Sequence, residues 1–337
     1  MLTKLKIILA AIVLSVVSSC NIRDSYDDCG IWLEFIFDHN MEYTDSFDPL
    51  VETVDVFVFD GEGKYVLAKH AECSDLHLHK RMLLSRLPFG NYRILAVGGL
   101  CEHFNFTDMN GGEFVPGVTT VEQVKLALNF KNAVTHEFPH LWFGQVTDVC
   151  YAADMSVWPI PVMRLTNKFH IALQHTVALP QNGSTRTTDE SPYTVEIVTP
   201  ESGAYDHNHN PLVREKLTHR PYYRTSSIET SETGAVHVAA NKINTMRLLE
   251  GEQGGYKLTV RNTETGDEIW TGDLLTLLAH TKPANRPDGT TLPLQEYFDR
   301  ESDWNIVIVH NVTADKGFAA MKIIVNGWIV WETGMGV

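Results

Sequence analysis

The residue with the clearest chemistry in this chain is Cys20, because of the residues that precede it. Two lysines come before an apolar run over residues 7–17, which leads into Val17-Ser18-Ser19-Cys20. A positive end, a short apolar run and a small-residue cut site indicate a secretory signal peptide. The four residues also have the form of a lipobox, in which the cysteine receives lipid and becomes the first residue of the mature chain. An ordinary signal peptide with a cysteine at its cut site is the alternative.

The lipid would decide how the mature chain is held. Each buried methylene of an acyl chain such as palmitate contributes about 0.8 kcal/mol, and a single chain holds a protein only marginally. Lipoproteins with this motif carry a diacylglyceryl thioether and often a further acyl chain, so release becomes negligible. The apolar run is too short to span a hydrocarbon core of ~30 Å. The sequence therefore predicts a signal peptide over residues 1–19 and a lipid-anchored linker over residues 20–29.

Other reactive side chains form no convincing site. Histidines two residues apart occur twice, as His77 with His79 and as His207 with His209. Either pair could bind a metal from one face of a strand, but such a pair without a nearby third ligand is usually a solvated polar feature. The chain has no G-x-S-x-G or Walker sequence. We therefore expect no catalytic residue, no metal site and no cofactor.

Length, charge and cysteine content limit the class of protein. The chain has 337 residues, which suggests two domains. Its net charge is -15, and loss of Lys4 and Lys6 with the signal peptide would change this to -17, so nucleic acid is not an expected partner. Beyond Cys20 there are four cysteines: Cys29, Cys73, Cys101 and Cys150. In an exported chain they could form disulfides in three pairings, or remain buried thiols.

Residues 30–166 show period-two alternation, the pattern of β-strands. In residues 51–59, apolar side chains occur on both faces, which predicts a strand in the interior of a sheet. A turn at Asp60-Gly61-Glu62-Gly63 predicts a hairpin. The strands expected in this half are residues 31–37, 51–59, 64–69, 82–87, 92–97, 121–128, 141–146 and 157–165.

Residues 167–337 repeat that pattern, so two β-sandwich domains in tandem are predicted, over residues 30–166 and 167–337. Short helices are expected at residues 273–279, capped by Asp273, and at residues 294–298. Residues 200–221 are expected to be a long irregular loop. The strands expected in this half are residues 168–177, 193–199, 235–240, 245–249, 256–261, 304–309 and 321–331.

Several stretches, together with the lipobox, give the chain a family resemblance through their order. They are Asp27-Asp28-Cys29-Gly30, Tyr43-Thr44-Asp45, residues 51–60, Leu87-Pro88-Phe89-Gly90-Asn91-Tyr92, Leu141-Trp142-Phe143-Gly144, residues 244–249 and Ile324-Val325-Asn326-Gly327-Trp328. The chain resembles the FimB-like minor subunits of Bacteroidales type V fimbriae, lipoproteins that anchor a fimbrial rod and limit its length. The resemblance implies two transthyretin-like β-sandwich domains, no enzyme activity, binding to fimbrial subunits and lipid attachment to the outer membrane through Cys20. The acidic residues after Cys20 favour surface exposure.

The resemblance also implies a mechanism. Structural subunits of such fimbriae lose their first strand and its lipid to an arginine-directed protease, and a strand from the neighbouring subunit fills the opened groove. An anchor must keep its lipid. No arginine occurs between Arg23 and Arg81, so residues 31–37 are expected to stay in their own sheet, although Arg23 itself could be cut. The rod could be held by an open sheet edge, by donation of residues 321–331, or by surface docking.

A surface glycan-binding lipoprotein is the main alternative. It predicts exposed, coplanar tryptophans beside a groove, whereas the anchor hypothesis predicts that Trp304 and Trp328 lie mostly in the core. A lipoprotein glycosidase would instead require two carboxylates that converge in a cleft.

Overall fold

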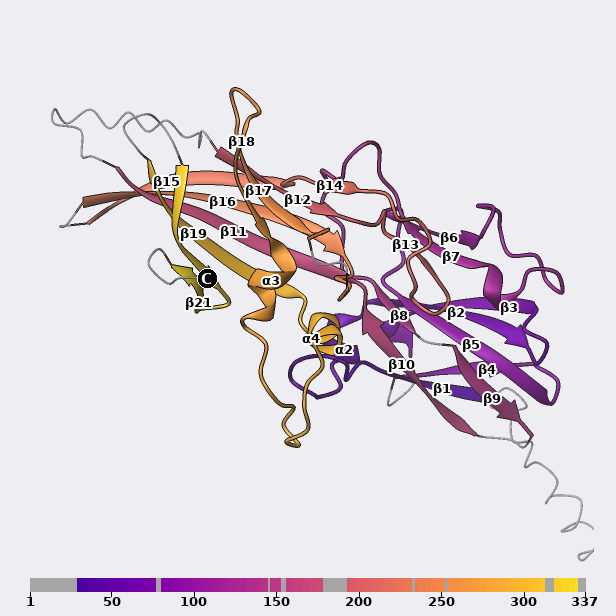
Figure 1. The fold of residues 1–337 in the computed structure, drawn as a ribbon. Helices are drawn as coiled ribbons and strands as arrows, with labels where there is room; N and C mark the ends of the chain where they lie inside the picture. The colour runs from indigo at the N-terminus through magenta and orange to yellow at the C-terminus, as the bar shows by residue number, and fades with distance from the viewer. Residues whose placement is uncertain are drawn as a thin grey trace, which may run out of the picture.

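The computed structural model describes residues 29–76, 80–144, 146–152, 156–177, 193–231, 234–251, 254–312 and 318–332. Over these residues the chain is all-β, as predicted, with sheets of eight, six, four and three strands (Figure 1). The α-helices of this part of the chain are short: α2 (Phe47–Leu50), α3 (Leu274–Ala279) and α4 (Leu294–Arg300).

The first half is built on the eight-stranded sheet, whose order is β3-β2-β5-β8-β10-β1-β4, with β9 paired to β5. As predicted, β2 is an interior strand: Val54, Val56 and Val58 face one core, while Phe57 and Phe59 face another. The strands of this sheet are β1 (Gly30–Ile36), β2 (Thr53–Asp60), β3 (Tyr65–Glu72), β4 (Arg81–Ser85), β5 (Gly90–Gly98), β8 (Trp142–Gly144), β9 (Thr147–Tyr151) and β10 (Val157–Arg164).

The three-stranded sheet contributes to the second of these cores. It comprises β6 (Phe104–Asp108), β7 (Val124–Leu128) and β13 (Ala204–Asp206). The sequence missed β6 and β9, and it placed β13 in an irregular loop. That expectation for residues 200–221 was wrong, because fully buried Tyr205 holds β13 against β7, and β14 (Leu217–His219) follows. These strands are only three residues long, too short to show an alternating pattern.

The second half is a sandwich of the six-stranded sheet β15-β16-β11-β19-β20-β21 and the four-stranded sheet β14-β12-β17-β18. Helices α3 and α4 pack against the same core, and the Asp273 carboxylate caps α3 by accepting from the Thr276 N–H at 2.7 Å, as predicted. The remaining strands are β11 (Thr166–Val177), β12 (Tyr193–Thr199), β15 (Tyr223–Ser231), β16 (Gly234–Met246), β17 (Lys257–Asn262), β18 (Glu268–Asp273), β19 (Asp303–Val312), β20 (Phe318–Val325) and β21 (Trp328–Glu332).

Two predictions in this half were wrong about where one strand ends and the next begins. Residues 235–240 and 245–249 were expected as separate strands, but β16 runs without interruption to Met246 because it pairs with β11 along its whole length. Residues 321–331 were expected as one strand, but they form the hairpin of β20 and β21. Asn326 and Gly327, both with positive φ, make its turn. Strands β15 and β18 were not predicted.

Polar contacts join the two halves near the point where β10 gives way to β11, with only Leu165 between them. Arg164 hydrogen-bonds Ser302, and its Nη1 lies 3.4 Å from a carboxylate oxygen of Asp303. Within the first half, its guanidinium is held over the rings of Phe37 and Trp142, 5.3 and 5.6 Å from their centroids. The Asn244 amide donates to the Phe138 carbonyl at 2.6 Å. The all-β fold of two tandem sandwiches is therefore confirmed, while the exact boundary between residues 166 and 167 stays a prediction.

The ion pair between Arg247 and Asp299 tests how much a buried polar contact contributes to the stability of the second half. Arg247 Nε and Nη2 donate to the two Asp299 oxygens at 2.6 and 2.7 Å, and both side chains are largely buried. Because Asp299→Ala leaves a buried guanidinium without its carboxylate, we expect it to lower the free energy of unfolding by about 3–5 kcal/mol. Urea titration measures this. Glu122→Gln, which removes the exposed partner of Arg93, is the control, and a loss no larger than that of the control would contradict the expectation.

Candidate functional site

The first strand, β1, is fixed in the interior of its sheet. It pairs in parallel with β10 from Trp32 to Ile36 and antiparallel with β4 from Gly30 to Glu34. On its core face, Ile31, Leu33 and Phe35 are fully buried. At about 1.5–3 kcal/mol for each buried side chain, these three alone contribute roughly 5–9 kcal/mol against removal of the strand. The strand lies within its own sheet in this structure, and its retention there in the mature protein stays a prediction.

The segment after β1 is also fixed. The buried Asn40 amide donates to the carbonyls of Phe37 and Thr44, at 3.0 and 2.8 Å. Asp45 accepts from the N–H groups of Phe37 and Phe47. Partial burial would raise the pKa of Asp45, but these donors and Lys80 outweigh it and lower the pKa. The loop that follows β1 is therefore tied back to the strand.

Helix α4 of the second half also holds this loop. Arg300 donates to the carbonyls of Asp38 and Asn40, both at 3.0 Å, and its guanidinium lies 4.3 Å from the centroid of the Tyr43 ring. Glu296 holds the same arginine in place through Nε at 2.8 Å. A pull on β1 would therefore be passed directly to the second half.

Exposed apolar side chains lie on β21, the last strand in the order of the six-stranded sheet. Strand β21 pairs with β20 and ends the order of its sheet. Its Trp328 and Ile329 are 68% and 50% exposed. The prediction that Trp304 lies in the core is confirmed, because it is fully buried and its indole N–H donates to Asn167 at 3.0 Å. The prediction that Trp328 lies in the core was wrong, because the β20–β21 turn places it at the free edge.

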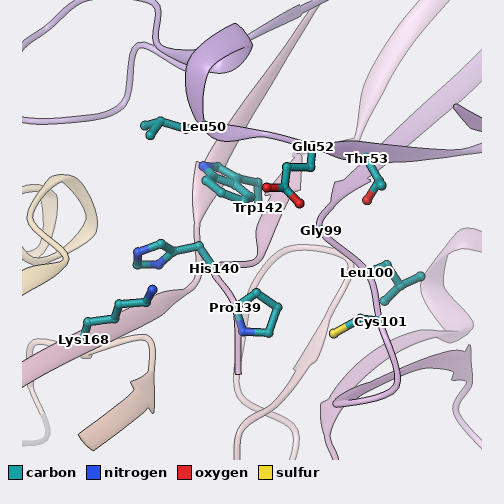
Figure 2. A pocket seen from close by; sticks show the side chains of 10 residues that line it. All are labelled: Leu50, Glu52, Thr53, Gly99, Leu100, Cys101, Pro139, His140, Trp142 and Lys168. Carbon is teal, nitrogen blue, oxygen red and sulfur yellow. The ribbon is translucent and has the colours of Figure 1, made fainter. Parts of the chain in front are cut away.

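A cavity of about 360 Å³ lies where the two halves meet (Figure 2). Glu52 and Lys168 bring opposite charges to its wall, and the buried Trp142 indole N–H has no hydrogen-bond partner. In Figure 2, Pro139 lies between His140 and Cys101, so these two side chains do not form a nucleophile and base pair. The cavity has polar groups but no arrangement suited to covalent catalysis.

Three buried histidines are held neutral by their surroundings. Burial, with Arg164 and Lys168 nearby, lowers the pKa of His140 to about 3. Burial also lowers the pKa of His219 to about 3 and that of His209 to about 4, against backbone hydrogen bonds that raise both. A histidine that stays neutral at physiological pH makes a poor proton donor, so these side chains serve packing.

The residues proposed from sequence as sites are not brought together. Cys20, His77 and His79 lie outside the described residues. His207 contacts the Asn208 amide at 3.0 Å, whereas His209 is buried and faces the Gly144 carbonyl at 3.2 Å. In the described ranges, no group of three or more His, Cys, Asp or Glu side chains is placed to hold a metal ion.

The cysteines beyond Cys20 are all described, and none is in a disulfide: Cys29, Cys73, Cys101 and Cys150 have free thiols. Burial and three neighbouring carboxylates raise the pKa of Cys73 to about 11, so its thiol is unreactive. No helix among the described residues is both long and apolar enough to cross a membrane.

The exposed Trp328 is the functional candidate that sequence reasoning missed. The sequence did contain a signal for this edge position, because Asn-Gly between apolar runs is the strongest short-range indication of a hairpin. A hairpin at Asn326-Gly327 would have made residues 328–332 a separate strand at a sheet edge.

The fold places the chain among all-β proteins built from packed sheets. The chain belongs to the family of fimbrillin-A associated anchor proteins Mfa1 and Mfa2, whose model matches residues 26–334. Over 328 residues it is 26% identical to the minor fimbrium anchoring subunit Mfa2 of Porphyromonas gingivalis, covering 93% of this chain and 90% of that protein. The family gives the chain a fimbria-associated role at the cell envelope.

Two solved structures have the same fold. One, from Bacteroides ovatus and described as an adhesin, is 38% identical with a TM-score of 0.78, covering 94% of this chain and 98% of that one. The other, from Bacteroides thetaiotaomicron and described as a polysaccharide-binding protein, is 28% identical with a TM-score of 0.71, covering 89% and 97%. Both matches extend through the two sandwiches.

The buried histidines predict how stability depends on pH. The pKa of His219 falls from 6.5 in the unfolded chain to about 3 in the fold, so the unfolded state binds more protons between these values. The contribution of His219 to the free energy of unfolding is therefore fully present above pH 6.5 and declines as the pH falls toward the pKa of the folded state. We expect His219→Gln to reduce the slope of the unfolding free energy between pH 4 and 6 by up to about 1.4 kcal/mol per pH unit.

Urea unfolding at several pH values measures that slope. The control is His280→Gln, at an exposed position. An unchanged slope in His219→Gln would show that His219 is not held neutral by the fold.

Proposed function

We propose that this chain is a non-enzymatic outer-membrane lipoprotein that anchors a fimbria to the cell surface through lipid on Cys20. The observation that most supports it is the position of β1, which has hydrogen-bonded strands on both sides. A lipid on Cys20 holds the body only while the chain that follows stays joined to the fold. With no arginine from residue 24 to residue 80, an arginine-directed protease cannot separate β1 from the body.

The same feature supports a role in limiting fimbrial length. A rod built by strand exchange grows as each subunit opens a groove for the strand of its neighbour. In this chain β1 fills the position between β10 and β4, so that groove is closed. A subunit with a closed groove can end a rod but cannot extend it, so its supply would set the number and length of rods.

The edge strand β21 is the best candidate for the contact with the rod. Donation of residues 321–331 would break β20 away from both β19 and β21, whereas addition of a foreign strand at β21 breaks no existing pairing. Main-chain hydrogen bonds along β21 would supply affinity, and Trp328 and Ile329 would supply apolar contact. The occupant we propose is an extended segment of a fimbrial subunit.

The alternative of glycan binding has less support. It requires exposed, coplanar tryptophans, and all seven tryptophans of the chain are among the described residues. Of these, Trp328 alone is exposed. It also lies away from the cavity of Figure 2, where Trp142 is buried. One exposed ring without a groove gives a sugar little to stack on.

We also divide the chain into domains of residues 30–166 and 167–337. The main support is that β1–β10 and β11–β21 pair into different sheets, apart from β13, which joins β6 and β7. The hydrogen bonds that Arg164 and Arg300 make across this boundary would make the two domains move together.

Replacement of the lipid-bearing residue tests the anchor. Cys20→Ala removes the thiol that would carry the lipid, so fimbriae should be shed from cells into the medium. The measurement is the ratio of fimbrial subunit in the medium to that on cells, with Cys150→Ala, at an exposed free thiol, as control. Fimbriae that stay firmly attached to Cys20→Ala cells would contradict the proposal.

Replacement of Trp328 tests the edge. Truncation of an aromatic anchor at an interface typically costs 2 kcal/mol or more, or about thirtyfold in affinity. We expect Trp328→Ala to weaken binding of purified fimbrial subunit by about this factor in surface plasmon resonance, with little change in stability. Phe89→Ala is matched in exposure, at 67%, but lies in the first half and should bind normally. Equal binding by both variants would exclude β21 as the contact.

A further inference from the structure

Three arginines gather beside the outer face of the four-stranded sheet β14-β12-β17-β18 (Figure 1). Arg220 follows β14 and Arg261 lies on β17, whereas Arg224 reaches in from the start of β15, at the edge of the six-stranded sheet. They line a basin of about 550 Å³ together with polar side chains from β12, β14 and β17. The charged lining residues are Arg220, Arg224, Arg261 and Glu196, so positive charge exceeds negative charge by two. On a chain whose net charge is -15, this is a local reversal of sign.

Glu196 organises the arginines. Its two carboxylate oxygens accept from Arg220 Nε at 2.8 Å and from Arg261 Nε at 2.6 Å. The carboxylate is nearly buried; burial raises its pKa, but the two arginines outweigh this and lower it, so the group stays ionised. One carboxylate thus holds two guanidinium groups by their Nε atoms, and Arg261 Nη1 also donates to the Gly266 carbonyl at 3.4 Å. Arginines fixed in this way lose little entropy when they bind a further anion.

The remaining groups complete the basin. Arg224 is positioned by donating from Nη2 to the Tyr193 carbonyl at 3.2 Å. Arg261 is partly neutralised by Glu268, whose oxygen lies 3.7 Å from Nη2, which leaves Arg220 and Arg224 as the stronger anion contacts. Four uncharged side chains also line the basin and can donate hydrogen bonds to anionic oxygens: Thr194, Thr218, Asn262 and Thr263.

The lining decides which anion fits. Its volume lies within the range of ligand sites, ~300–1,000 Å³, and exceeds what a single inorganic anion needs. No aromatic side chain is among the lining residues, so a sugar ring would have no face to stack on. Spaced guanidinium groups pair best with planar carboxylates, through paired N–H···O bonds.

We propose that this basin binds the carboxylate side chains of an acidic peptide segment on a protein partner. It requires neither lipid on Cys20 nor strand addition at β21, and it lies beside β15, at the other end of the six-stranded sheet from β21. The acidic remainder of the surface would repel such a segment, so the basin would also fix where and in which orientation the partner docks.

The test uses the full-length chain in nonionic detergent and a fluorescein-labelled octaglutamate peptide as probe. Fluorescence anisotropy should show saturable binding that weakens as salt is raised. We expect the double variant Arg220→Gln/Arg224→Gln to lose at least tenfold in affinity, while Glu196 keeps its bond to Arg261. Arg220→Lys/Arg224→Lys retains the charge but not the planar fork and should bind with intermediate affinity.

Arg93→Gln is the matched control, because Arg93 is a half-exposed, ion-paired arginine on β5 of the first half. Equal circular dichroism and melting temperature would show that all variants fold. The proposal is overturned by a lack of saturable binding, or by binding that the double variant retains. It is also overturned if oligogalacturonate binds in the basin and octaglutamate does not, which would identify an anionic sugar as the ligand.

Discussion

The structure depends on the pairing of β1 with strands on both of its sides. The lipid proposed on Cys20 would transmit force only through the backbone that links it to the fold, and β1, which begins at Gly30, is the first strand of the described residues. Because the pull is applied along the strand, it loads the hydrogen bonds to β10 and β4 in shear rather than one at a time. The ion pair of Glu34 with Arg81, at 2.7 Å, crosses to the neighbouring strand and adds to this resistance.

Force that reaches β1 must then pass to the second half, and the junction combines polar contacts with a buried apolar cluster in which Tyr205, Leu217 and Met246 pack against the first half. Arg164 stacks on Phe37 and Trp142 and also hydrogen-bonds Ser302. Its burial lowers its pKa, against the nearby carboxylate of Asp303. The two rings of the first half leave the guanidinium few alternative positions, so its contacts with Ser302 and Asp303 help to fix the orientation of the second half. This junction suits a protein that has to bear load without bending.

Local sequence pattern predicted the parts of the fold that alternation and turn chemistry control. Apolar residues on both faces identified β2 as an interior strand, and Asp273 identified the start of α3. Strands as short as β13 have no period to read, and their place depends on a distant partner such as β7. The sequence could not predict the cluster of Arg220, Glu196 and Arg261 for the same reason. Its members are separated by more than 20 residues and meet only through strand pairing.

The exposure of Trp328 was misjudged for a different reason, which bears on function. Alternation shows which side chains share a face, but not whether a further strand or helix covers that face. Most folds cover or charge a free edge to prevent association. Here the edge strand has Lys322 and Glu332 paired at 3.2 Å near its end and leaves the apolar pair of Trp328 and Ile329 uncovered. The fold buries the core face of β1 fully and leaves Trp328 and Ile329 exposed, so one end of the chain is closed and one sheet edge is open. That asymmetry is what a terminal subunit requires: one strand position that no neighbour can enter and one edge that a neighbour can extend.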